Sequence, residues 1–247
     1  MKKQLLLVTI ILALIPGCKK NEPGLPGKWQ QKASLPLTPG RTGAVSFAIG
    51  DKGYFVGGSE NPVYHNDVYA YDPATDSWTQ KTSCPGNHFL FPACFVIHDI
   101  AYIGICQIET GYTKEFWAYD PATDGWSRKA DYPGSARSGS PNFAIGDFGY
   151  VASDSSTDFW MYDPLTDKWT RKNDVPTGVS NKWGANFVIG KKGYTGAGFD
   201  TEFWEYDPVQ DSWSHKATKG GFGLAGCSLN GNGKDGLLND FWEFTPE

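Results

Sequence analysis

The sequence predicts an all-β fold, a β-propeller of five blades whose incomplete last blade is closed by the N-terminal strand of the domain. One observation is an eleven-residue stretch ending in tryptophan, which occurs at residues 68–78, 116–126, 159–169 and 203–213. The other is its period, because Tyr71, Tyr119, Tyr162 and Tyr206 are separated by 48, 43 and 44 residues. Such a period, with recurring aromatic residues, is typical of propeller blades.

Each stretch has the pattern of a β-hairpin. The aromatic and β-branched residues before the tyrosine favour a strand. An Asp-Pro pair then favours a turn, because proline presets φ and the aspartate side chain caps the turn. Tryptophan opens the next strand seven residues after the tyrosine. Because the tyrosine and tryptophan recur in every full repeat, we assign them to packing between neighbouring sheets rather than to ligand binding.

The paired aspartates of each turn, such as Asp72 and Asp76, raise the alternative of calcium sites. Calcium takes about six to eight oxygen ligands, whereas a turn of this kind needs its aspartates in any case. We therefore favour the turn and predict neither a metal nor a cofactor.

Two further strands precede each tyrosine strand. In the first copy they are residues 44–49 and 54–58, joined by a Gly-x-x-Gly turn whose glycines supply the backbone freedom of a tight hairpin. The third and fourth copies repeat this pattern at residues 143–152 and 187–196. The second copy keeps both strands but has His98-Asp-Ile-Ala101 at the turn.

The two ends of the domain carry complementary halves of a repeat. Residues 29–36 match the segment after each later tryptophan, but no Tyr-Asp-Pro precedes Trp29. Residues 238–246 match a tyrosine strand and stop before any tryptophan. We expect these two strands to pair with each other, because closing the ring removes exposed sheet edges.

From residue 28 onward the chain resembles kelch repeats. The resemblance is carried by the inner apolar strand, the Gly57-Gly58 ending and the spaced tyrosine and tryptophan. It implies four-stranded blades around a central channel, in a domain covering residues 28–247. Five tryptophan strands give 44 residues a blade, whereas six or seven blades are commoner in the family. Residues 220–229 offer material for one strand, so we expect the last blade to be incomplete.

Residues 1–17 have the pattern of a signal peptide. Lys2 and Lys3 precede an apolar run from residue 5 to 15, which is too short to span a membrane as a mature helix. Residues 15–18 resemble the lipobox of bacterial lipoproteins, which implies lipidation of Cys18; an ordinary signal peptide with a chance cysteine is the alternative. Residues 18–27 form a polar tether rich in proline and glycine.

The residue after this cysteine is Lys19 rather than aspartate. The lipoprotein resemblance then implies an outer membrane lipoprotein of the bacterial cell envelope, facing the periplasm or the cell surface. The lipid anchor is the only expected contact with the membrane. The formal charge of −5 gives no basic patch for nucleic acid, so we expect no nucleic-acid partner. We also expect a monomer.

Four further cysteines, Cys84, Cys94, Cys106 and Cys227, do not have the spacing of a zinc site. Cys84 occupies a position filled by apolar residues in other repeats, so a small apolar filler is the default interpretation. Cys94 and Cys106 fall on adjacent strands of one hairpin. They are the pair that we consider for a disulfide, since an exported protein meets oxidising conditions.

The kelch resemblance implies that two sets of loops share one face, and long loops on a rigid scaffold often bind ligands. The candidate binding residues at this channel mouth are Arg41, Tyr64, His65, Phe89, Glu109, Tyr112, Arg137, Asp154, Lys182, Trp183 and Asp200, with His88 and Phe199 in the same loops. Basic side chains are expected to ring the mouth, and aromatic side chains to stack on sugars or peptides. The alternative is that each is an ordinary solvated loop residue.

These observations favour a lipid-anchored extracytoplasmic binding module for a protein or glycan. The alternative is a carbohydrate-active enzyme, a sugar epimerase or oxidase, that uses the channel mouth; a structural part of the envelope is a third. The four histidines are scattered over the repeats and do not match the copper site of galactose oxidase. No Gly-x-Ser-x-Gly or comparable catalytic motif occurs, so we assign no catalytic residue.

Overall fold

The computed structural model describes residues 28–152, 156–176, 185–196, 203–216 and 241–245. Within these ranges all regular elements are β-strands, as predicted for an all-β protein. Across the same residues there is accordingly no helix with the length and apolar character needed to cross a bilayer.

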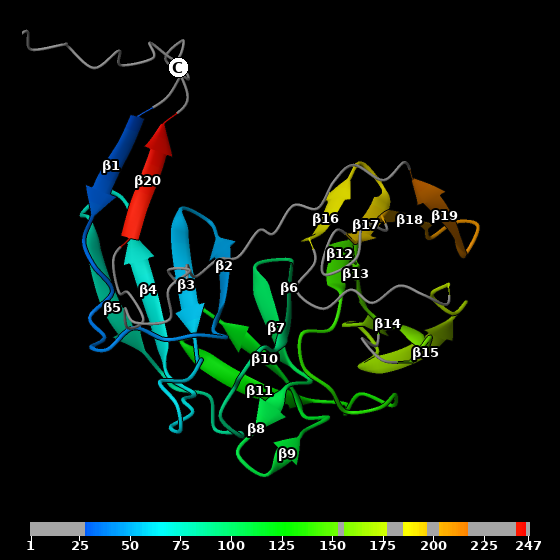
Figure 1. The fold of residues 1–247 in the computed structure, drawn as a ribbon, viewed down its shortest axis with the longest axis horizontal. Coiled ribbons are helices and arrows are strands. Elements are labelled where there is room, and N and C mark those ends of the chain that lie inside the picture. Colours follow the sequence, from blue (N-terminus) through cyan, green and yellow to red (C-terminus); the bar gives the residue numbers. More distant parts are fainter. Residues whose placement is uncertain (1–27, 153–155, 177–184, 197–202, 217–240, 246–247) are drawn as a thin grey trace, which may run out of the picture. The chain divides into compact units, whose positions relative to one another are not determined.

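Sixteen of the strands form four antiparallel sheets of four strands, here called blades 1 to 4, each following chain order (Figure 1). Blade 1 contains β2 (Val45–Ile49), β3 (Lys52–Val56), β4 (Val68–Asp72) and β5 (Ser77–Lys81). Blade 2 contains β6 (Ala93–Ile97), β7 (Ile100–Gly104), β10 (Phe116–Asp120) and β11 (Gly125–Lys129). Blade 3 contains β12 (Asn142–Ile145), β13 (Phe148–Ala152), β14 (Phe159–Asp163) and β15 (Lys168–Lys172). Blade 4 contains β16 (Ala185–Ile189), β17 (Lys192–Gly196), β18 (Phe203–Asp207) and β19 (Ser212–Lys216).

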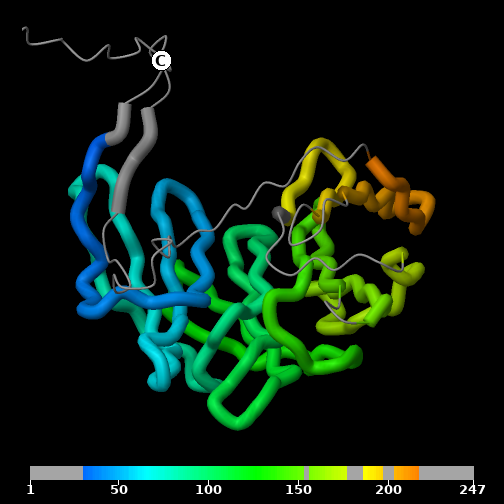
Figure 2. The backbone as a smooth tube through the Cα atoms, in the orientation of Figure 1, coloured from blue at the N-terminus to red at the C-terminus, as the bar shows by residue number. Residues whose placement is uncertain are grey.

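The strand order confirms the predicted repeat of two inner strands followed by a tyrosine strand and a tryptophan strand. The backbone tube shows the chain running back and forth through one blade before it enters the next (Figure 2). A small hairpin that the repeat did not predict, β8 (Gln107–Ile108) and β9 (Gly111–Tyr112), lies in the loop between β7 and β10.

The first and last strands, β1 (Lys28–Lys32) and β20 (Phe241–Thr245), pair in a two-stranded sheet. This confirms the predicted pairing of the chain's two half-repeats. Apart from Lys32 and Phe241, these two strands belong to a unit separate from the one that holds blades 1 to 4. Four complete sheets and one shared pair agree with about five blades; the expected short last repeat at residues 217–240 lies outside the described residues.

Each tyrosine lies directly opposite the tryptophan of the same hairpin, as in the pair Tyr162 and Trp169. In the intervening turn, the side chain of Asp163 accepts a hydrogen bond from the backbone N–H of Leu165, which closes an Asx turn. The last turn residue, Asp167, has a φ of 52°. Aspartate is among the few non-glycine residues that adopt this left-handed conformation readily, which explains its place in the repeat.

Asp167 also joins blade 3 to blade 2. Its Oδ1 accepts a hydrogen bond from the Tyr162 hydroxyl at 2.7 Å and another from the backbone N–H of Ala130 at 2.9 Å. Ala130 directly follows the last strand of blade 2, and its carbonyl accepts a hydrogen bond from Trp169 Nε1 at 2.9 Å. We call this arrangement the Tyr–Asp–Trp latch.

The latch occurs four times among the described residues. The other three sets are Tyr71, Asp76 and Trp78 on Ala33; Tyr119, Asp124 and Trp126 on Thr82; and Tyr206, Asp211 and Trp213 on Asn173. Ala33 directly follows β1, so the predicted equivalence of residues 29–36 with the end of a repeat is confirmed.

The apolar core lies between successive blades rather than within any one of them. Phe116, from blade 2, packs edge-on against Tyr162 of blade 3, with ring centroids 5.0 Å apart. Closer to the inner strands, the ring of Phe95 lies where a side chain on Gly149 of the next blade would have to be. The repeat tyrosines are buried and the tryptophans partly buried, which confirms their assignment to packing.

We predict that Trp169→Ala lowers the free energy of unfolding by about 3–5 kcal/mol, because it removes a ring packed between two blades. The loss approaches the whole stability of a typical domain, about 5–15 kcal/mol. Urea denaturation measures it, and Trp169→Phe is the control that keeps a ring but not the N–H donor. If the alanine variant unfolds like the wild type, the packing assignment is wrong.

Candidate binding surface

The loops that end β3, β5 and β7 meet at one end of blades 1 and 2. The backbone N–H of Gly58 donates to the carbonyl of Phe89 at 2.8 Å, and the N–H of Phe89 donates to the carbonyl of His65, also at 2.8 Å. Leu90 forms an isolated bridge with Gln107 of the third loop. The predicted sharing of one face by the two sets of loops is thus confirmed for these two blades.

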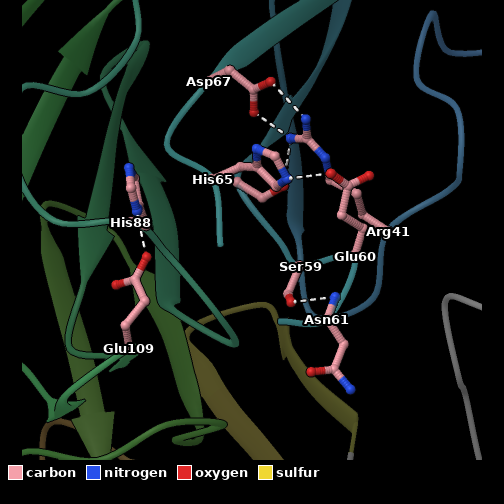
Figure 3. Close-up of polar contacts among 9 residues, drawn as sticks. Arg41, Ser59, Glu60, Asn61, His65, Asp67, His88 and Glu109 are labelled. Atoms are coloured by element: carbon pink, nitrogen blue, oxygen red, sulfur yellow. Dashed lines mark hydrogen bonds and ion pairs between the residues drawn. The ribbon is translucent and has the colours of Figure 1, made fainter. Parts of the chain in front are cut away.

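Arg41 is a structural residue of this region and not a ligand-facing one. Its guanidinium forms a bidentate ion pair with Asp67 and donates to the carbonyl of Gly57 at 3.2 Å (Figure 3). Arg41 is only 7% exposed. The prediction that it faces the channel mouth is therefore corrected: the side chain ties the segment before β2 to the loop between β3 and β4.

The prediction that Phe89 binds a ligand at the channel mouth is also wrong. Its side chain is completely buried in the core between blades 1 and 2, at 6.5 Å from the ring of Trp126. A loop position favours exposure, but the backbone hydrogen bonds on both sides of Phe89 hold the ring inward. A ligand therefore does not reach it.

Two histidine–carboxylate pairs lie in the same loops (Figure 3). His88 Nδ1 lies 2.5 Å from Glu109 Oε1, and both side chains are nearly half exposed. His65 Nε2 lies 3.4 Å from Glu60 Oε1. Gln107 Nε2 donates a hydrogen bond to the Tyr64 hydroxyl at 3.0 Å. We call the set Glu60, Tyr64, His65, His88, Gln107 and Glu109 the loop surface.

The two histidine–carboxylate pairs of the loop surface are electrostatically linked. The hydrogen bond from His88 is the main reason that the pKa of Glu109 lies below its usual value. The charge of His65 acts in the same direction. Glu109 therefore stays ionised under mildly acidic conditions and presents a fixed negative charge beside two histidines.

The other predicted binding residues differ in where the structure places them. Tyr112, on β9, is 55% exposed and extends the loop surface through its pairing with Gln107. Arg137 is partly buried, with its Nε shielded from solvent, and its role in binding stays a prediction. Several predicted residues lie outside the described part of the chain: Cys18, Asp154, Lys182, Trp183, Phe199, Asp200 and Cys227.

Sequence reasoning missed the acidic residue that directly precedes each third strand. Asp67 fills this position in blade 1, where it holds Arg41. Glu115 and Asp158 fill it in blades 2 and 3, where each accepts a hydrogen bond from the indole N–H two residues later, at 3.3 and 3.0 Å. An alignment of the repeats starting before the tyrosine strand would have revealed the pattern. Glu60 and Gln107 carry no such repeat signal.

In blade 4, Glu205 of β18 is the acceptor at the centre of a group of polar side chains. Hydrogen bonds from Lys192, Tyr194 and Lys216 surround this buried carboxylate. Donation from Lys192 comes first among the causes that lower its pKa to about 2. All of these partners come from the same sheet, so Glu205 stabilises blade 4. Because its folded pKa is depressed, that contribution is present above the usual pKa and is lost as pH falls towards 2.

Cys84, Cys94 and Cys106 are free thiols, so the structure contradicts the considered disulfide between Cys94 and Cys106. Burial raises the pKa of each thiol to about 12. Cys84 fits the predicted role of small apolar filler, at 1% exposure. Across the described residues, no three histidine, cysteine or acidic side chains are grouped so as to hold a metal ion.

The four-stranded antiparallel sheets that follow one another in chain order have the architecture of a β-propeller. Residues 40–85, which contain blade 1, match the model of the Kelch motif. A solved structure described as "Structure of YjhT" is similar, with a TM-score of 0.65 and 19% sequence identity over 77% of this chain and 74% of that chain. Identity at this level establishes likeness of fold alone. No curated protein matches the chain.

We predict that Arg41→Ala lowers the free energy of unfolding by about 3–5 kcal/mol, because it leaves the Asp67 carboxylate without its buried partner. Adding Asp67→Ala to this variant is expected to restore part of the loss, since no unpaired charge then remains. Urea denaturation of the single and double variants measures both effects. A single variant as stable as the wild type would make Arg41 a candidate ligand-facing residue again.

Proposed function

We propose that the protein is a lipid-anchored, extracytoplasmic binding module whose loop surface engages a protein or glycan ligand. The observation that carries the proposal is the loop surface itself. Its polar side chains lie on loops that backbone hydrogen bonds and the Arg41–Asp67 ion pair hold in place. Binding residues on loops held by a rigid scaffold are a general feature of proteins.

The contacts make this surface continuous over two blades. The backbone N–H of Glu60 donates to the carbonyl of Val63, whose side chain is 50% exposed. Gln107 connects Tyr64 to Tyr112 at the other side. Exposed aromatic and aliphatic groups within a polar rim are the usual composition of a protein–protein interface, and this favours a protein over a glycan at this site.

The charged side chains of the loop surface indicate which kind of partner it would bind. Two carboxylates, Glu60 and Glu109, lie on this surface beside two histidines, so the surface is acidic wherever the histidines are neutral. A basic segment of a partner protein would find acceptors here.

We predict that the double variant His88→Ala and Glu109→Ala weakens ligand binding by about tenfold or more, equivalent to at least about 1.4 kcal/mol. Binding is measured on peptide and glycan arrays with the full chain in a detergent whose headgroup is not a sugar. The variant should retain the wild-type melting temperature, because both side chains are half exposed.

A matched control exists at the other end of the blades. His98 Nε2 lies 2.9 Å from Asp147 Oδ1, and both side chains are largely exposed in hairpin turns. His98→Ala is expected to leave binding unchanged. Equal losses in the control and the double variant, or no loss in either, would contradict the proposed surface.

The lipid anchor and the outer membrane location remain sequence-based proposals, supported by the charged start, the apolar run and Cys18. We predict that Cys18→Ser leaves the protein unlipidated and releases it from membranes, whereas the wild-type protein is held firmly by several acyl chains. Detergent phase separation measures this: the wild type should enter the detergent phase and the variant the aqueous phase. A wild-type protein in the aqueous phase would contradict the anchor.

A further inference from the structure

A cavity of about 410 Å³ opens where the loops of blades 2 and 3 meet the outer strands of blade 3. The side chains that define it are Lys114, Ser135, Thr157, Asp158, Trp160 and Arg171. None of them belongs to the loop surface. The cavity is a depression open to solvent, with a volume in the range of about 300–1,000 Å³ found for small-molecule sites.

The polar groups around the cavity are held in place by contacts with one another. Asp158 Oδ2 accepts hydrogen bonds from Trp160 Nε1 at 3.0 Å and from the Tyr132 hydroxyl at 3.4 Å. Arg171 lies over the Trp160 ring at 6.0 Å and donates to Asp174 at 2.7 Å. Asp174 in turn accepts from the Thr157 hydroxyl at 2.9 Å. The wall is therefore organised before any ligand arrives.

Blade 2 contains the same group of residues and provides an internal comparison. Glu115, Trp117 and Arg128 occupy the positions of Asp158, Trp160 and Arg171. Glu115 accepts from Trp117 Nε1 at 3.3 Å and also reaches Arg128, at 3.7 Å, while the guanidinium lies 5.4 Å from the Trp117 ring.

Blade 3 differs from blade 2 in the length of the carboxylate side chain. Asp158 is one methylene shorter than Glu115. In both blades the arginine forms an ion pair with the aspartate three residues later, Asp131 or Asp174, but only Arg128 also reaches the acid before the third strand. The guanidinium is also farther from the indole than in blade 2. The shorter acid keeps the hydrogen bond to Trp160 and leaves space in front of Arg171.

We propose that this cavity binds a neutral saccharide. The two cationic groups, Lys114 and Arg171, are balanced by Asp158 and by Asp174 behind Arg171, so the site does not favour a ligand with net charge. A carboxylate acceptor, cationic donors and two hydroxyls suit the adjacent hydroxyl groups of a sugar, and the edge of Trp160 supplies an apolar contact. The proposal does not depend on the proposed function, because it concerns a different cavity.

The test uses the full chain in a sugar-free zwitterionic detergent, with saturation-transfer NMR against methyl glycosides of common neutral hexoses at millimolar concentration. The wild type is expected to transfer saturation to at least one glycoside. Asp158→Glu, which restores the longer acid of blade 2, is expected to weaken that binding about tenfold or more, because it fills the space while keeping the charge.

Two further variants distinguish the loss of sugar binding at the cavity from unfolding of the protein. Ser135→Tyr adds a bulky ring from an exposed loop position and should block the cavity without changing the melting temperature. Glu115→Asp shortens the equivalent acid of blade 2, whose side chain does not line the cavity, and should leave binding unchanged. Agreement of all three variants with these expectations supports the site.

Three results overturn the proposal. One is the absence of transfer to every neutral glycoside. Another is equal binding by the wild type, Asp158→Glu and Ser135→Tyr, which would place the sugar elsewhere. The third is selective binding of glucuronate or inorganic phosphate over the neutral glycosides, which would mean that the charge of Lys114 and not the balanced set governs the cavity.

Discussion

The structure depends on an aspartate that serves two blades at once. In each Tyr–Asp–Trp latch, one carboxylate oxygen accepts the tyrosine hydroxyl of its own blade and a backbone N–H of the preceding blade. The tryptophan N–H then closes the contact on the carbonyl of that same preceding residue. Each latch thus gives a hydrogen-bond partner to the hydroxyl of a buried tyrosine, which would otherwise be costly to bury, and it also engages both backbone polar groups of one residue in the preceding repeat.

The protonation states of the latch reinforce one another. Hydrogen bonds from the Ala33 backbone and then from Tyr71 hold the pKa of Asp76 below its usual value, so the acceptor stays ionised. Burial, followed by the hydrogen bond to Asp167, raises the pKa of Tyr162, so the donor stays protonated. Since the pKa of Asp76 is depressed, the contribution of Asp76 to stability is present above the usual pKa and declines as pH falls through the folded value.

Most features of the latches could be predicted from the sequence. The hairpins, the turns, the packing role of the tyrosines and the pairing of β1 with β20 follow from periodicity, because every blade must make the same contact with its neighbour. The role of the aspartate as a bridge between blades was not foreseen, since it had a sufficient explanation in the turn. Its partner, Ala130, lies 37 residues away from Asp167 and has no side-chain signature.

The loop residues were harder to interpret, because a position in a loop does not determine burial. Arg41 and Asp67 meet across 26 residues, and nothing in the spacing of the first blade marks them as partners. Phe89 looked like an exposed aromatic residue, yet two backbone hydrogen bonds turn its ring into the core. His65, Tyr64 and Glu109 were correctly brought to one surface because the order of strands alone places their loops at the same end.

A repeated scaffold of this kind confines functional variation to groups that the latch does not use. The tyrosine, aspartate and tryptophan must recur for the blades to stay together, so differences appear in the loops and in the outer side chains of the last two strands. Glu115 and Asp158 illustrate this: both hold an indole N–H in the same way, but the acid that is one methylene shorter does so without also contacting its arginine. A change of this size leaves the latch of its own blade intact, with Asp167 still bound to Tyr162 and Ala130. The fold can therefore acquire a cavity in one blade without any loss in the contacts that join the blades.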